Sequence, residues 1–138
     1  FYKYLLKDKR VKLLDISIPS AKIIENAGAI ISNSGTVSWE SILVGKPAIV
    51  FGWAWFTDCK SCFVVDSVET LRKAINKSRT ISMENVFRDR DEFIKKLEKR
   101  IIYGANIHNN LRCVGKNYDY EEGVRNLAKA LTIVCKTK

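Results

Sequence analysis

The chain has 138 residues, 46% of them hydrophobic, and contains seven glycines and two prolines. This composition predicts one globular domain with a single core and excludes disordered and repeat architectures. Its 24 lysines and arginines outnumber 15 acidic residues and give a net charge of +9. Such an excess is typical of a solvated basic surface, or of attraction to anions such as a nucleotide-sugar, a glycan or an anionic membrane surface. No apolar run reaches the roughly 18 residues of a membrane-spanning helix.

The first half of the chain predicts strands and helices in alternation. The expected elements are a strand over residues 11–15, a helix over 19–27, a strand over 29–32, a helix over 36–44 and a strand over 47–51. Pro19 stands in the first turn of its helix, and Gly28 and Gly45 end the two helices. The apolar runs at 29–32 and 47–51 are typical of buried parallel strands.

The second half of the chain becomes increasingly helical. We expect a strand over residues 62–65, a helix over 67–77 capped by Ser67, a helix over 82–103, a loop over 104–119 and a helix over 120–135. The order of elements predicts an α/β fold, a Rossmann-like three-layer αβα domain with a parallel sheet. Because no linker or internal repeat interrupts the pattern, residues 1–138 are expected to form one domain.

A turn rich in small residues joins the expected strand at 29–32 to the helix that follows. Gly35 lets the backbone approach a ligand closely, and the hydroxyls of Ser34 and Thr36 lie beside N–H groups that a helix leaves unpaired. These features predict a phosphate site. If Thr36 caps the helix, Glu40 lies one turn later on the same face, where it can accept hydrogen bonds from a ribose. Turn formation and the helix dipole alone also explain these residue types, so a structural role stays open.

Aromatic side chains follow the strand at 47–51 at its carboxyl end, where ligands bind in open α/β sheets. We expect Trp53 or Phe56 to stack on a nucleobase, and Trp55 to pack beneath the loop. Asp15 and Asp66 also follow expected strands, but turn or cap roles are favoured for both. Because the aromatic residues do not interleave with the basic runs, nucleic acid is not expected as a partner.

Four cysteines stand at positions 59, 62, 113 and 135. Cys59 and Cys62 have the spacing of a zinc or redox motif, but no second close pair follows them. We therefore expect free or structural thiols, and neither a metal nor another cofactor.

The spacing S-G-T-x-x-x-E-x-x-x-x-G-K-P from Ser34 to Pro47, followed by an apolar strand and the segment 52–56, resembles one family of glycosyltransferases. It is similar to the C-terminal half of GT-B enzymes of the capsular polysaccharide biosynthesis and export family, which includes Kdo transferases. The resemblance covers about residues 22–75. In that family, and in similar bacterial sialyltransferases, a Ser/Thr pair in this turn binds the phosphate of a CMP-sugar. The resemblance assigns that role to Ser34 and Thr36, with Gly35 between them.

The resemblance implies a cytoplasmic glycosyltransferase that transfers a sugar such as Kdo from a CMP donor, or alternatively a UDP donor, to a glycan or glycolipid acceptor. The excess of basic residues also fits peripheral contact with the inner face of a membrane. The family carries a His-Pro pair that serves the donor nucleotide, whereas His108, the only histidine, is followed by Asn109. We therefore expect the chain to be a C-terminal fragment that is inactive alone, with its catalytic base in a missing N-terminal half.

Two other classes of protein fit the same motif. UDP-sugar 2-epimerases share the fold and a similar Ser-Gly turn, so the motif identifies a nucleotide-sugar site better than a reaction. A non-catalytic interaction module that retains the fold is the second alternative.

Overall fold

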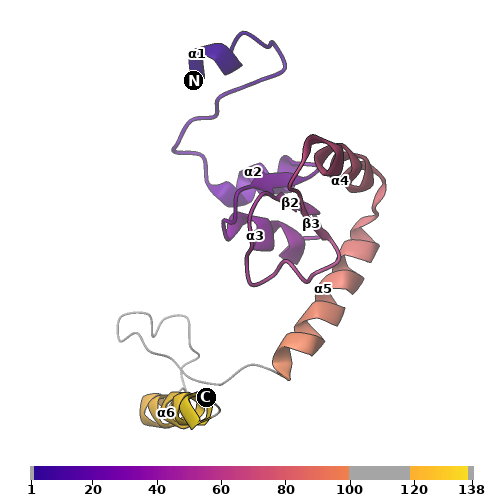
Figure 1. Ribbon diagram of the computed structural model, residues 1–138. Coiled ribbons are helices and arrows are strands. Elements are labelled where there is room, and N and C mark those ends of the chain that lie inside the picture. The colour runs from indigo at the N-terminus through magenta and orange to yellow at the C-terminus, as the bar shows by residue number, and fades with distance from the viewer. Residues whose placement is uncertain (1, 100–118, 137–138) are drawn as a thin grey trace. The chain divides into compact units, whose positions relative to one another are not determined.

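The computed structural model describes residues 2–99 and 119–136 (Figure 1). The chain divides into two compact units, residues 1–95 and residues 96–138. The elements in chain order are α1 (Tyr2–Leu5), α2 (Ser20–Asn26), β1 (Ile30–Ser32), α3 (Val37–Leu43), β2 (Ala48–Val50), β3 (Cys62–Val64), α4 (Val68–Thr80), α5 (Met83–Glu98) and α6 (Tyr120–Lys136). The predicted helices and strands between residues 19 and 99 are therefore present, most of them with ends shifted by one to three residues.

The first unit contains a parallel sheet of three strands in the order β1-β2-β3. In its central row Ile31 pairs with Ile49, and Ile49 pairs with Phe63. The strand β2 is fully buried, as its apolar sequence predicts for the middle strand of a parallel sheet. Helices and a parallel sheet make this an α/β fold.

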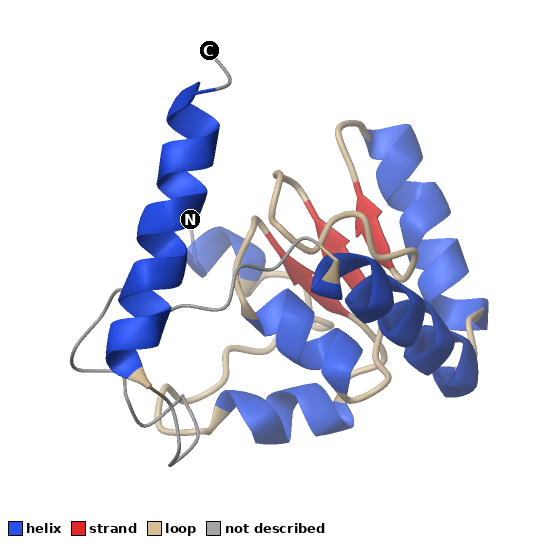
Figure 2. Ribbon diagram, turned by 90° about the horizontal axis from the view of Figure 1, so that it is seen from below, coloured by secondary structure: helices blue, strands red, loops and turns tan. Residues whose placement is uncertain are grey.

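Helices cover both faces of this sheet (Figure 2). Ile49 forms a core cluster with Val65 and with Ala74 of α4, which places α4 on the face of Ile49. Ser32 follows Ile31 on β1, so its side chain lies on the opposite face. There the hydroxyl oxygens of Ser32 and Ser38 are 2.7 Å apart, which places α3 on that second face.

Residues at the ends of α3 and α4 explain where these helices stop and start. Gly45 has a φ of +80° and ends α3, a conformation that residues with a side chain rarely adopt. The last turn of α3 gains a distant partner, because the Arg90 guanidinium donates a hydrogen bond of 2.9 Å to the Leu43 carbonyl oxygen. At the start of α4, Ser67 forms a capping box with Thr70, as the sequence predicts for Ser67.

The strand expected over residues 11–15 is wrong. These residues form an irregular segment in which Leu13 and Leu14 are more than half exposed. In the described part of the chain no strand pairs with this segment. An apolar run this short becomes a strand only where a neighbour satisfies its backbone groups. Asp15 forms a turn instead, accepting hydrogen bonds from the N–H and hydroxyl groups of Ser17 at 2.8 and 2.6 Å.

The helices predicted at 82–103 and 120–135 correspond to α5 and α6. Residues 100–103, and all of the expected loop except Asp119, lie outside the described residues. The part of α5 within the first unit packs on the loop that follows β2. There the buried Asp89 carboxylate accepts a hydrogen bond of 2.6 Å from the Ser61 hydroxyl, and Lys60 forms an ion pair with Glu92 at 2.7 Å.

Candidate functional site

The turn after β1 and the segment after β2 meet at the carboxyl edge of the sheet. The Phe51 N–H group donates to the carbonyl oxygens of Ser32 and Asn33 at 3.2 and 3.1 Å. The Gly52 N–H group also donates to Asn33, at 2.9 Å. A Cβ atom at Gly52 would lie only 3.3 Å from Asn33 Oδ1, so the two segments are in close contact. Both predicted groups of site residues are therefore fixed to one edge, the position at which open α/β sheets bind ligands.

The residues predicted to bind phosphate, Ser34, Gly35 and Thr36, are all exposed. Gly35 does not have a positive φ. A Cβ atom built on it would touch nothing closer than Val37 Cγ1 at 3.7 Å, which is ordinary van der Waals contact. Neither the backbone conformation nor the packing of the chain therefore requires glycine at this position.

Thr36 caps α3 by its position but not through its side chain. Thr36 occupies the cap position, but its φ and ψ of −59° and −22° are already helical, and its hydroxyl makes no capping hydrogen bond. A capping side chain normally needs extended backbone to reach the N–H groups that follow. The Thr36 hydroxyl instead lies 3.5 Å from Glu40 Oε1. Two N–H groups in this first turn are satisfied by the backbone, because Ser38 donates to Gly35 and Glu40 donates to Thr36.

Glu40 lies one turn after Thr36 on the same face of α3, as its spacing predicts, and it is exposed. Its side chain also lines a cavity of about 280 Å³ between α2 and α3. The apolar walls of this cavity include Ile24 and Leu43, and Glu25 stands at its border. Glu40 thus borders an apolar cavity and also contacts the Thr36 hydroxyl.

The aromatic residues after β2 separate into an exposed and a buried set. The Trp53 ring is 82% exposed, whereas Phe56 is 1% exposed. Phe56 packs with Trp39 and Trp55, and its ring centroid lies 6.1 Å from that of Trp39 and 5.4 Å from that of Trp55. The buried ring has no free face for a nucleobase, which corrects the expectation for Phe56 and leaves Trp53 as the stacking candidate. Trp55 packs in this cluster as predicted.

Two further members of this aromatic cluster, Trp39 and Phe93, were not predicted from the sequence. Trp39 comes from α3 and Phe93 from α5, and their ring centroids are 5.5 Å apart. Phe93 faces inward together with Val86 and Asp89, at positions three and four residues apart. That spacing in the charged sequence of α5 is the signal that could have identified its buried face.

Cys59 and Cys62 are free thiols and both are buried. Burial raises the pKa of Cys62 to about 12, with a further contribution from Cys59, and burial also raises the pKa of Cys59. A thiol that resists ionisation is a poor nucleophile and a poor metal ligand. Within the described ranges, no three histidine, cysteine, aspartate or glutamate side chains lie close enough together to hold a metal ion.

Asp66 stands after β3 and serves the start of α4. Its carboxylate accepts a hydrogen bond of 3.0 Å from the Thr70 hydroxyl, and its N–H group lies 3.2 Å from the same oxygen. This is the cap role that the sequence favoured over a ligand contact.

Comparison of the chain with protein-family models, with curated proteins and with solved structures gives no match in any of the three. None of the helices in the described residues is long and apolar enough to cross a membrane. The functional interpretation therefore depends on the residues and geometry of the sheet edge.

Proposed function

We propose that the exposed turn between β1 and α3 binds the phosphate of a nucleotide-sugar, and that the chain is the donor-binding part of a glycosyltransferase in capsular polysaccharide biosynthesis. The surrounding fold is then Rossmann-like, with three αβα layers. Two observations support this arrangement, namely the parallel strand order and the positions of α3 and α4 on opposite faces of the sheet.

Gly35 is the observation that carries the proposal. Its φ is ordinary, and a side chain there would meet no close neighbour in the chain. A glycine that the protein itself does not need is explained if a ligand approaches the backbone at that point. The exposed hydroxyls of Ser34 and Thr36 lie on either side of it, and each can donate to a phosphate oxygen once the Thr36 hydroxyl leaves its 3.5 Å contact with Glu40.

The other exposed residues then take complementary roles. Glu40 accepts hydrogen bonds from the ribose hydroxyls, and Trp53 offers an exposed ring to the base from the adjacent strand end. Hydrogen bonds to the phosphate stabilise the negative charge that develops on the leaving nucleotide, which is electrostatic catalysis without a protein nucleophile. The resemblance favours a CMP-sugar such as CMP-Kdo as donor and a glycan or glycolipid as acceptor.

Substituting Gly35 by alanine tests the site with little change to the fold. We expect Gly35→Ala to melt like the wild type, because the added methyl group has room, and to weaken CMP binding in titration calorimetry by at least about tenfold, since a methyl group on the ligand side blocks close approach. Gly28→Ala is the matched control, because a Cβ atom there also has nothing within 4 Å.

Thr36→Val gives an independent measurement, because it removes the hydroxyl and keeps the branched shape. We expect it to reduce CMP affinity by about 1–3 kcal/mol, the range for a hydrogen bond to a charged group. Thr80→Val, on the last residue of α4, is the control. If CMP and UDP both fail to bind the wild-type chain, or if Gly35→Ala and Gly28→Ala bind CMP equally well, the proposed site is refuted.

A further inference from the structure

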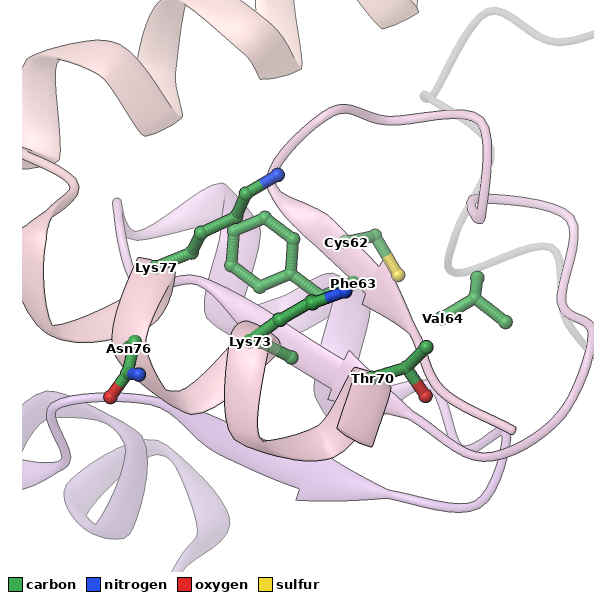
Figure 3. Close-up of a pocket in the computed structure, with 8 residues that line it drawn as sticks. Cys62, Phe63, Val64, Thr70, Lys73, Asn76 and Lys77 are labelled. Carbon is green, nitrogen blue, oxygen red and sulfur yellow. The ribbon is translucent and has the colours of Figure 1, made fainter. Parts of the chain in front are cut away.

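A groove of about 510 Å³ lies between the outer edge of β3 and the helix α4 (Figure 3). Phe63 and Val64 form its strand side, and Thr70, Lys73 and Lys77 form its helix side. The groove lies on the strand farthest from β1, so it is separate from the proposed nucleotide site at the ends of β1 and β2.

The strand β3 presents unused backbone groups along this groove. Among the residues that the structure describes, no strand pairs with its outer edge. On the inner edge Ser61 accepts from Ala48, and Val65 donates to Val50. In a parallel pair alternate residues face the neighbour, so Val64 directs both its N–H and its C=O outward. These groups are available to one further strand.

The two lysines give the groove a charge preference. Lys73 and Lys77 are one helical turn apart on α4, and both side chains extend toward Phe63 (Figure 3). The Lys77 ammonium lies 5.9 Å from the centroid of the Phe63 ring. Lys73 is paired at 2.6 Å with Glu69, but both side chains are more than two thirds exposed. An exposed pair of this kind competes only weakly with an incoming carboxylate.

The two faces of β3 determine which side chains a strand added beside it would need at alternate positions. Phe63 faces α4 and the two lysines, whereas Val64 faces the other side and is 52% exposed. In an added strand, alternate side chains on one face lie about 7 Å apart, close to the roughly 6 Å between positions one turn apart on a helix. Two acidic residues at alternate positions can therefore meet Lys73 and Lys77, and the residue between them lies beside Val64.

We propose that an extended segment of another protein, with acidic and apolar residues in alternation, binds here by adding a strand to β3. Backbone hydrogen bonds to Val64 supply affinity, and the two lysines and Val64 select the acidic and apolar side chains. A second copy of this chain is disfavoured as the partner, because each copy carries a net charge of +9 and pairing would bring the two lysine pairs together.

Fluorescence anisotropy with labelled peptides tests the proposal. The probe is an acetylated peptide of alternating glutamate and valine, and its control has the same residues in two blocks. We expect the alternating peptide to bind about tenfold more tightly than the block peptide. The Lys73→Glu/Lys77→Glu variant should lose about tenfold in affinity and should instead bind a peptide of alternating lysine and valine.

Arg72→Glu/Arg79→Glu is the matched charge control, since it changes the same net charge on α4 outside the groove. It should change affinity less than about threefold. Slower amide exchange of Val64 in the complex would confirm strand addition. The proposal is overturned if both peptides bind equally, if both charge variants lose affinity equally, or if a single-stranded oligonucleotide competes with the alternating peptide regardless of these substitutions.

Discussion

Removing the Asp89 carboxylate should destabilise the first unit by an amount that depends on Ser61. The hydroxyl of Ser61 is fully buried and donates at 2.6 Å to Asp89, which is 8% exposed. A hydrogen bond to a charged group contributes about 1.5–3 kcal/mol, and a buried partner left without one costs a similar amount. We therefore expect Asp89→Ala to lower the free energy of unfolding by about 2–3 kcal/mol.

A double-mutant cycle separates this hydrogen bond from other effects of the substitution. Ser61→Ala leaves the buried carboxylate without its partner, so we expect a similar loss for that single variant, and a loss for the double variant well below the sum. The coupling energy should be about 1.5–3 kcal/mol. Asp91→Ala, an exposed aspartate on the same helix, should cost less than about 1 kcal/mol.

Urea unfolding followed by tryptophan fluorescence is a suitable assay, because all three tryptophans belong to the first unit. The slope of the free energy against urea concentration must be the same in all variants for the cycle to be valid. If the losses at Asp89 and Ser61 add within about 0.5 kcal/mol, the hydrogen bond does not stabilise the loop after β2 and the reasoning is refuted.

Three further predictions concern the site and its support. Phe56→Ala should lower the free energy of unfolding by about 3–5 kcal/mol, because its ring is buried. Trp53→Ala should change the free energy of unfolding by less than about 0.5 kcal/mol and weaken nucleotide binding by about 1–3 kcal/mol, because its ring is exposed. The reverse pattern in melting and calorimetry would contradict the roles assigned to these rings. Glu40→Gln should leave melting near normal and reduce affinity for CMP by about 1–3 kcal/mol but not that for free cytosine; equal losses would exclude a ribose contact. Burial raises the pKa of Cys62 to about 12, so the folded chain keeps this thiol protonated at pH values where the thiol of the unfolded chain, with a pKa near 9, is already ionised. The free energy of unfolding should therefore keep the full contribution of Cys62 below pH 9 and fall as the pH rises toward 12. If the stability of a Cys62→Ala variant falls as steeply over this range, Cys62 is not the cause.

The alternation of strands and helices between residues 29 and 80 could be predicted because each boundary has a local cause. Gly45 ends α3 through its own backbone conformation, and Ser67 begins α4 through its own side chain. The strand predicted over residues 11–15 was wrong because a strand forms only beside a neighbouring strand, and the residues of the segment do not show whether such a neighbour exists. Local signals thus predict where an element ends more reliably than whether an isolated strand exists.

The same distinction applies to the candidate site. The approach of Glu40 to Thr36 follows from helix geometry and was predictable from spacing. The burial of Phe56 was not, because its partner Trp55 also packs against Phe93, which lies far along the chain on another helix. Likewise, no local pattern connects Ser61 to Asp89 across 28 residues. Contacts of this range depend on how α5 packs and become visible only in three dimensions.

Gly45 places two independent constraints on a single position. Its φ of +80° disfavours any side chain, and a Cβ atom there would collide with Met83 Cγ and lie 2.9 Å from Phe87 Cζ. A compensating change in α5, such as Met83→Ala, removes the collision with Met83 but leaves the close approach to Phe87 and the backbone penalty of about 1–2 kcal/mol. Mutational tolerance at this position is therefore low in any genetic background, and a second-site suppressor can restore only part of what an alanine at position 45 removes.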